Sequence, residues 1–272
     1  MKIFIFTKKH ILIFIATLLI FFSYSFYCIF AKNYNSFCYE NTVFCVSSLS
    51  DFKDASSYGI QEKIDNIYKS KEKIAYLTFD DGPTKVATTK VLDILKEENV
   101  KATFFVIGYR VKEFPETIKR EYEEGHFIAN HTYSHKNSKL YQSKDTFLNE
   151  LKSTETAISE AIGTNYTSHL FRFPNGSKGT SYSGSKKKCI GYLKDLNYGY
   201  VDWNALNQDS IGHYTASQLL NNLKKSCKNK DSLVILMHDT ADVSRSYLAL
   251  QDSIKFLKSE GYSFKTFEEF TK

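Results

Sequence analysis

The feature that most restricts the fold is an alternation of short apolar runs with longer amphipathic stretches from about residue 71 to the C-terminus. The runs typical of strands are 73–79, 101–108, 126–131, 169–173, 198–204, 232–238 and 263–267. The stretches with helical periodicity include Val86–Glu98, Lys144–Ile162, Ala216–Cys227 and Ser244–Glu260. Such alternation predicts parallel strands joined by crossover helices. Roughly seven repeats favour an α/β barrel over a short open sheet.

The N-terminus differs sharply from this pattern. The stretch Ile11–Ala31 carries no charged residue, and about twenty such residues cross a bilayer as a helix. Lys2, Lys8 and Lys9 precede it, which predicts that residues 1–10 stay in the cytoplasm and that the rest is exported. The expected location is therefore the cell membrane, with a single pass and an extracytoplasmic domain.

A cleaved signal peptide is the alternative for this segment, and the protein would then be secreted. Its apolar region should be shorter, and Ile29 stands where a small residue is expected before Ala31. We therefore expect an uncleaved transmembrane anchor at 11–31. Residues 32–70 are polar and lack a long periodic pattern, so we expect a stalk there, followed by one domain at 71–272.

Composition excludes few functions. The formal net charge is +6 and the basic residues form no arginine-rich tract, so we expect no nucleic-acid partner. We favour a monomer. Outside the anchor, Cys38, Cys45, Cys189 and Cys227 allow three disulfide pairings. The open alternative is that these cysteines are small buried hydrophobic residues.

Polar side chains interrupt the apolar pattern at the C-terminal ends of the expected strands. They are Asp80, Asp81, His131, Arg172, Asp202, His238 and Asp239. In a parallel barrel those ends converge on one face, where such folds carry their sites. Residues far apart in the sequence are therefore expected to meet.

Two of these segments indicate a metal centre. Asp80 and Asp81 are adjacent, and two carboxylates at the end of a buried strand are costly unless a cation or an arginine lies beside them. His131 and His135 are four residues apart and share a face if the chain turns helically. Two histidines and one carboxylate form the open three-ligand site of a catalytic metal. Spacing alone leaves open which aspartate is the ligand. Taken singly, each motif also fits a structural turn or an ordinary histidine.

Five motifs in order carry a resemblance to a known family. They are TFDDGP at 78–83, NHTYSH at 130–135, FRFPNG at 171–176, DWN at 202–204 and ILMHD at 235–239. Over about residues 71–270 the chain resembles the polysaccharide deacetylases, the NodB-homology domain of carbohydrate esterase family 4. The resemblance implies a distorted (β/α) barrel and a metal-dependent hydrolase that removes acetyl groups from a polysaccharide.

The resemblance also implies a role for individual residues. Asp80 is expected to be the general base, held by Arg172, and His238 the general acid, tuned by Asp202. The expected metal ligands are Asp81, His131 and His135, with one divalent ion, zinc first and cobalt, nickel or manganese as alternatives. The expected substrate contacts are the backbone N–H near Asn175 and a pocket for the acetyl methyl group walled by Trp203 and Leu236.

Two positions depart from the family pattern. Phe173 and Asn175 stand where many members have proline and tyrosine. A backbone N–H donor survives such a change, whereas an aromatic wall does not. The expected substrate is peptidoglycan N-acetylglucosamine. The alternatives are an esterase for O-acetyl groups, a chitooligosaccharide deacetylase and a non-catalytic glycan-binding protein.

Overall fold

A computed structural model of the chain describes residues 59–240 and 246–271. Eight parallel strands form one sheet in the order β5-β4-β3-β2-β1-β7-β6, and β8 pairs with β1 beside this path. The strands are β1 Ile74–Asp80, β2 Thr103–Val106, β3 Phe127–Asn130, β4 Leu170–Phe171, β5 Gly199–Tyr200, β6 Ala205–Leu206, β7 Ser232–His238 and β8 Ser263–Phe264. The predicted parallel α/β architecture is confirmed.

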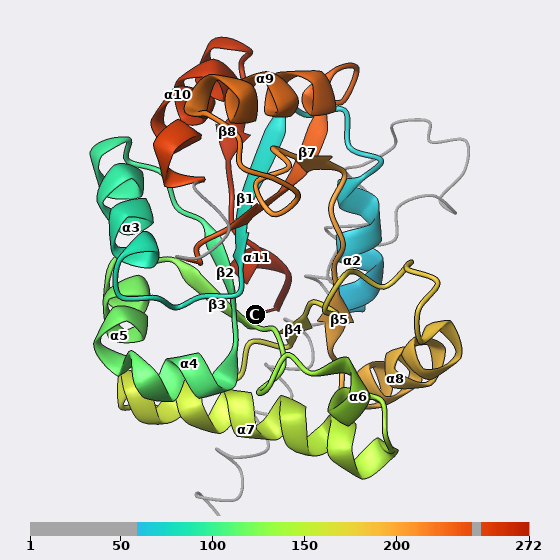
Figure 1. Cartoon of the computed structure of the whole chain (residues 1–272). Coiled ribbons are helices and arrows are strands. Elements are labelled where there is room, and N and C mark those ends of the chain that lie inside the picture. Colours follow the sequence, from blue (N-terminus) through green and yellow to red (C-terminus); the bar gives the residue numbers. More distant parts are fainter. Residues whose placement is uncertain (1–58, 241–245, 272) are drawn as a thin grey trace, which may run out of the picture. The chain divides into compact units, whose positions relative to one another are not determined.

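Helices surround the curled sheet (Figure 1). They are α2 Ile60–Ile67, α3 Ala87–Glu97, α4 Gly108–Glu113, α5 Pro115–Glu123, α6 Asn137–Leu140, α7 Lys144–Ile162, α8 Ser183–Asp195, α9 Ala216–Cys227, α10 Tyr247–Ser259 and α11 Glu268–Thr271. Local signals set the ends of α7 and α9. Capping boxes at Ser143 and Thr215 start α7 and α9, and Gly163 ends α7 in the left-handed conformation.

The two central strands, β1 and β7, show why the sheet is buried on both faces. Ala75, Leu77 and Phe79 belong to the cluster that includes side chains of α3 and α10. The alternate residues Ile74 and Tyr76 belong to a second cluster with residues of α2. Because successive side chains point to opposite faces, the later inward positions on β1 go to Thr78 and Asp80. On this face of β1 the polar side chains of Thr78 and Asp80 therefore follow the apolar residues Ile74 and Tyr76.

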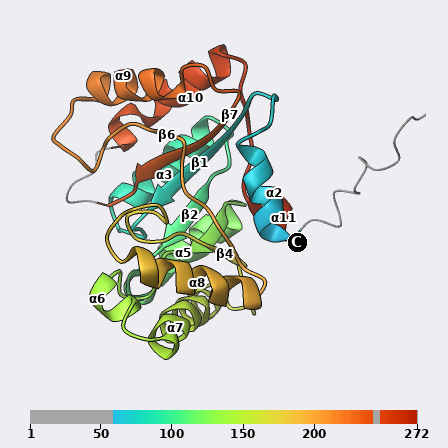
Figure 2. The same ribbon diagram turned by 90° about the vertical axis from the view of Figure 1, so that its right-hand side faces the viewer.

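The sheet curls but is not closed in the described part of the chain, since its edge strands β5 and β6 do not pair with each other. Helix α2 packs at this side, and Ile64 and Ile67 are buried there. A Cβ atom at Gly199 in β5 would lie 2.5 Å from Ile64 Cδ1, so glycine permits this close approach. Helix α2 also lies beside α11 (Figure 2).

Helix α2 changes the expected domain boundary. We placed residues 32–70 in a polar stalk, but Ile60–Ile67 is a helix with a buried apolar face. The short stretch contains isoleucines at 60, 64 and 67 with helical spacing, and the surrounding polar residues hid that pattern. The domain therefore includes these residues, which complete its inner core.

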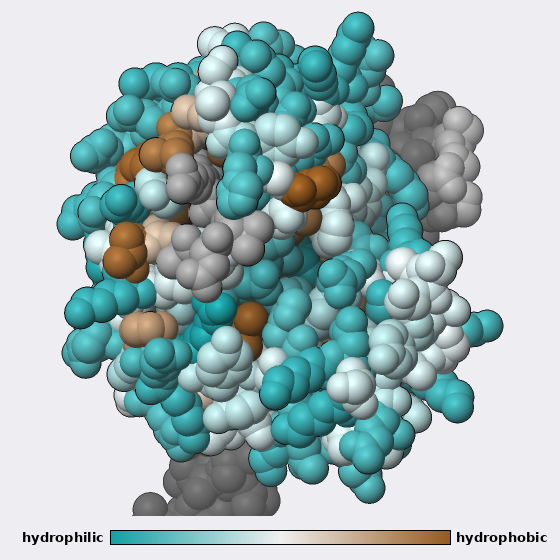
Figure 3. Space-filling view, in the orientation of Figure 1, coloured by the Kyte–Doolittle hydropathy of each residue, from teal (hydrophilic) through white to brown (hydrophobic). Residues whose placement is uncertain are grey.

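Several expectations fall outside the described residues. The anchor at 11–31, most of the stalk, and Cys38 and Cys45 all lie there. No helix within 59–240 or 246–271 is long and apolar enough to span a membrane. Cys189 and Cys227 are both free and buried, which agrees with their interpretation as small buried hydrophobic residues. Hydrophilic side chains cover most of the face shown in Figure 3.

Candidate active site and metal centre

Asp80 and His238 end the two central strands in matching register. Side chains at paired positions of neighbouring parallel strands lie on the same face, so both point to the same region. Arg172, which follows β4 and is fully buried, donates from Nη1 to Asp80 Oδ1 at 2.7 Å and to Thr78 Oγ1 at 2.7 Å. A buried carboxylate needs such a partner to remain ionised. The expected contact between Arg172 and Asp80 is present.

Asp81 reaches the same region because the backbone turns at this residue. Its φ is 73°, in the left-handed region, and the following Gly82–Pro83 peptide is cis. Adjacent residues of a continuing strand would point to opposite faces. A Cβ atom at Gly82 would lie 2.1 Å from Asp239 Oδ2, so a larger residue would clash at this turn. The sharp turn therefore brings two neighbouring carboxylates to one site.

Three side chains can hold a metal ion. Asp81 Oδ1 lies 3.4 Å from His131 Nε2 and 3.2 Å from His135 Nε2, and the three ligand atoms lie within 4.8 Å of one another. Asp81 Oδ1 is buried and has no hydrogen-bond partner, which a bound cation would supply. His131 Nδ1 lies 2.8 Å from the carbonyl oxygen of Arg172, so a proton on Nδ1 leaves Nε2 as the ligand. The residues fit a divalent metal.

The electrostatics at two of the three candidate ligands, Asp81 and His135, agree with a cation at this place. Burial raises the pKa of Asp81, but the neighbouring His131, His135 and His238 outweigh it and bring that pKa well below its usual value. Burial and the nearby His131 lower the pKa of His135 to about 4. A carboxylate and a neutral imidazole are the protonation states that bind metal.

A carboxylate on α7 holds the loop that carries the two histidines. Glu150 Oε2 accepts hydrogen bonds from the backbone N–H groups of Tyr133 at 3.1 Å and Ser134 at 2.7 Å. The His135 N–H donates to Thr132 Oγ1 at 2.9 Å. Thr132 and His135 both have positive φ, at 70° and 54°, and such backbone needs support from its surroundings. No sequence motif marked Glu150, because the stretch Lys144–Ile162 shows only the periodicity of a helix.

The partner of His238 is Asp209 and not Asp202. Asp209 Oδ1 lies 2.8 Å from His238 Nδ1, while Asp209 Oδ2 accepts the backbone N–H of His238 at 2.7 Å and the hydroxyl of Ser246. Burial lowers the pKa of His238, but Asp209 outweighs it and, with the charges of Asp80 and Asp81, raises that pKa to about 9. Asp209 follows no strand-like run, so no sequence signal marked it.

Asp202 makes different contacts. Its Oδ1 accepts the backbone N–H of Ser177 at 2.8 Å and its Oδ2 accepts the Ser177 hydroxyl at 2.6 Å. Asp202 lies three residues before β6, whereas Asp209 lies three residues after it, and this short strand was not predicted. The carboxylate that contacts His238 therefore lies in the segment after β6.

The expected substrate contacts fall into two groups. Leu236 lies two residues before His238 on β7 and thus on the same face. Asn175 is exposed, with φ of 61°, in the loop after β4. Trp203 instead lines a cavity at the side of the sheet that includes none of the three metal-site residues.

The fully buried Asp239 accepts a hydrogen bond from Thr88 Oγ1 at 2.5 Å and thereby joins the turn after β1 to the end of β7.

Together these groups form a hydrolytic arrangement. A carboxylate held by an arginine and an imidazole with a raised pKa lie at the ends of adjacent strands, next to a three-ligand cation site. Such a pair can take a proton from water and give one to a leaving group.

Comparison with known proteins identifies the family. Residues 68–201 match the polysaccharide deacetylase family. The chain is 38% identical over 208 residues to a peptidoglycan-N-acetylglucosamine deacetylase of Bacillus cereus, covering 74% of this chain and 72% of that protein. It is 34% identical over 212 residues to the peptidoglycan-N-acetylmuramic acid deacetylase PdaA of Bacillus subtilis, covering 76% of each.

A solved structure agrees with the sequence comparison. The crystal structure of a polysaccharide deacetylase from Bacillus cereus matches with a TM-score of 0.62 and 36% identity, over 72% of this chain and 92% of that one. Identity above 30% over most of both proteins establishes common descent, and the Asp-His-His cluster is the divalent metal site typical of these enzymes. The chain therefore belongs to the polysaccharide deacetylase family and is a carbohydrate esterase family 4 hydrolase that acts on amide bonds.

Proposed function

We propose that the protein removes the N-acetyl group from N-acetylglucosamine in peptidoglycan, releasing acetate. The observation that carries this proposal is the placement of Asp80 and His238 in register on adjacent strands, beside the Asp81, His131 and His135 cluster. The names of the matched relatives support a peptidoglycan substrate.

The residues divide the chemistry between them. A divalent cation held by Asp81, His131 and His135 would activate water and polarise the acetamide carbonyl, and imidazole with carboxylate ligands favours zinc. Asp80 accepts the proton of the attacking water. Arg172 orients Asp80 through the 2.7 Å charge-assisted hydrogen bond.

The departing amine requires a proton from the enzyme. His238 carries that proton at neutral pH because Asp209 raises its pKa to about 9. Without this donor the leaving group would be an amide anion. The backbone N–H of Asn175, in the loop after β4, donates to the developing oxyanion, and Leu236 packs against the acetyl methyl group.

We further propose that the domain acts outside the cell, held to the membrane by residues 11–31. The uncharged stretch and the lysines before it support this placement. A domain exported in this way lies next to the cell wall, which contains the proposed substrate.

Acetate release tests the proposed function. The full-length, zinc-loaded protein is incubated with purified peptidoglycan, with chitooligosaccharide and acetylxylan in parallel, and with a chelator control. We expect acetate and free glucosamine amino groups from peptidoglycan, and no activity after chelation. Faster release from acetylxylan would assign the O-acetyl esterase alternative, and release from none of the three would contradict deacetylation.

A further inference from the structure

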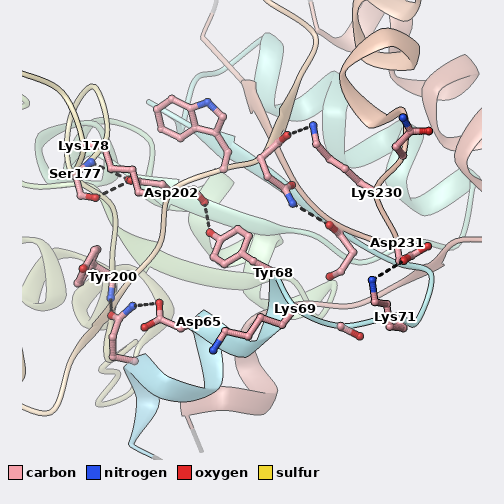
Figure 4. A pocket seen from close by; sticks show the side chains of 16 residues that line it. Asp65, Tyr68, Lys69, Lys71, Ser177, Lys178, Tyr200, Asp202, Lys230 and Asp231 are labelled. Carbon is pink, nitrogen blue, oxygen red and sulfur yellow. Dashed lines mark hydrogen bonds and ion pairs between the residues drawn. The ribbon is translucent and has the colours of Figure 1, made fainter.

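A cavity lies at the open side of the sheet, and its lining includes none of the three metal-site residues. Its volume is about 540 Å³, and it is lined by α2 and the segment after it, the loop after β4, the link between β5 and β6, and the segment before β7 (Figure 4). This volume lies in the range of small-molecule sites. No step of the proposed mechanism takes place in this cavity.

The lining combines aromatic rings with fixed polar groups. Tyr68, Tyr200 and Trp203 supply the rings. The carboxylate of Asp202 is held by both the N–H and the hydroxyl of Ser177, and Lys230 Nζ is held by the carbonyl oxygen of Asn204 at 2.6 Å. A pyranose ring presents an apolar face of C–H groups and an edge of hydroxyl groups. Aromatic faces beside preorganised donors and acceptors complement both.

The charges favour a neutral saccharide over an anion. Four lysines line the cavity, but three of them already contact oxygen atoms of the chain. Lys71 lies 3.9 Å from Asp231, Lys69 donates to Asn66, and Lys230 donates to two backbone carbonyls. The carboxylates of Asp65, Asp202 and Asp231 also line the cavity, and their negative charges offset three of the four lysine charges, so little net positive charge remains to attract an anion.

One buried residue joins this cavity to the catalytic site. Arg172, which holds Asp80 through Nη1, donates from Nε to the carbonyl oxygen of Val201 at 3.1 Å and from Nη2 to that of Asp202 at 3.4 Å. The Tyr68 hydroxyl donates to the same Asp202 carbonyl at 3.0 Å. The backbone carbonyl of Asp202 in the cavity wall therefore also contacts Arg172, the residue that holds the proposed base Asp80.

We propose that this side cavity, lined by Tyr68, Tyr200 and Trp203, binds a saccharide unit of the glycan other than the unit being deacetylated. The inference rests on the proposed function, in which the substrate is a polymer. Binding there holds the glycan chain on the enzyme and lowers KM for long substrates without taking part in the chemistry.

The chain provides its own probe, because Trp203 is the only tryptophan. Full-length protein with chelator present is titrated with chitooligosaccharide while the tryptophan fluorescence is recorded. We expect a saturable change. The Tyr68→Ala variant should bind about tenfold more weakly, since it removes one ring from the cavity. Tyr122→Ala is the matched control, because Tyr122 is similarly exposed but lies on α5, and it should bind like wild type.

A second variant guards against misfolding. If Tyr68→Ala loses its native circular dichroism, Lys178→Ala, at an exposed cavity residue, should weaken binding several-fold. No saturable change with the saccharide would overturn the proposal. Equal affinity of wild type and the folded cavity variants, or a response to inorganic phosphate alone, would overturn it too.

Kinetics separate this inference from the proposed function. With peptidoglycan, Lys178→Ala should raise KM and leave kcat within about twofold, because the cavity holds substrate without stabilising the transition state. Acetate release with no fluorescence response would reject the cavity and keep the deacetylase. A saturable, Tyr68-dependent response without acetate release would keep the cavity and reject the deacetylase.

Discussion

At the residue scale, His238 is held from two directions by one carboxylate. The Asp209 carboxylate accepts a hydrogen bond from the backbone N–H of His238 and contacts the ring nitrogen Nδ1 of the same residue. It also accepts the hydroxyl of Ser246, and its own N–H donates to Asn207 Oδ1 at 3.1 Å. This network fixes the orientation of the imidazole and favours its protonated form.

A substitution at Asp209 should therefore change the pH dependence. His238 donates a proton only when protonated, so activity should fall as pH rises through its pKa, which is about 9. Asp209→Asn removes the charge that raises this pKa, so burial dominates and the alkaline limb of kcat should move to lower pH. Asp202→Asn is the matched control and should leave the position of that limb unchanged. A limb that moves with Asp202→Asn and stays with Asp209→Asn would contradict the assignment.

Sequence motifs pointed to single site residues where a side chain that can bind metal also follows the end of a predicted strand. Asp81, His131 and His135 follow strand ends, and the structure brings them together as expected. Asp209 could not be identified, because it depends on a two-residue strand, β6, that is too short to produce a periodic pattern. Asp202 has the same side chain and lies near the C-terminal end of the strand-like run 198–204, so the sequence pattern favoured it over Asp209.

At the element scale, α7 determines the geometry of the metal site. Glu150 is buried on this helix and accepts two N–H groups of the histidine loop, while Lys139 Nζ contacts its other oxygen at 2.8 Å. Asn130, at the end of β3, donates to the carbonyl oxygen of Leu151 at 2.9 Å and ties the same loop to α7. One helix thus positions two metal ligands that it does not itself contain.

Glu150→Gln should weaken metal binding. The change keeps the shape of the side chain but removes the charge that accepts both N–H groups, so the histidines lose support. We expect zinc affinity to fall by about 10- to 100-fold, the usual effect of a residue that orients ligands. Competition with a chelating dye measures it. Glu160→Gln on the exposed side of α7 is the control, and an equal loss there would contradict the role of Glu150.

Element boundaries were predictable where local signals are strong. The predicted stretches Lys144–Ile162 and Ala216–Cys227 coincide with α7 and α9, since each begins after a capping box. The strands β1 and β7 were found because long apolar runs produce them. Helix α8 was missed because polar residues and glycine fill most of Ser183–Asp195. Packing of Cys189 and Leu193 against the domain, more than local propensity, determines this helix.

At the scale of the whole domain, α2 covers the inner core at the open side of the sheet. Its Ile64 and Ile67 pack in one cluster with Tyr76 and Val201, and burial of each isoleucine contributes about 1.5–3 kcal/mol. The helix precedes β1 in sequence but packs near β5, the strand at the far edge. Helix α2 therefore links the start of the domain to the edge strand β5 of its sheet.

Removal of α2 should destabilise the domain. A protein that begins at Lys71 should have a free energy of unfolding at least about 3 kcal/mol below one that begins at Gly59. Urea denaturation followed by circular dichroism measures the difference. In the longer protein, Ile64→Ala should cost about 2–5 kcal/mol, whereas the exposed Glu62→Ala should cost little. Equal stability of the two lengths would show that α2 is dispensable.

The most direct test of the account separates proton transfer from metal binding at Asp80. Asp80 is proposed as the base and not as a ligand, so Asp80→Asn should keep the zinc content of wild type. Its kcat for acetate release from peptidoglycan should fall by about 10²- to 10⁴-fold, the usual contribution of a positioned base. His131→Ala, in contrast, should lose the metal. A zinc-loaded Asp80→Asn enzyme that releases acetate as fast as wild type would contradict the central claim.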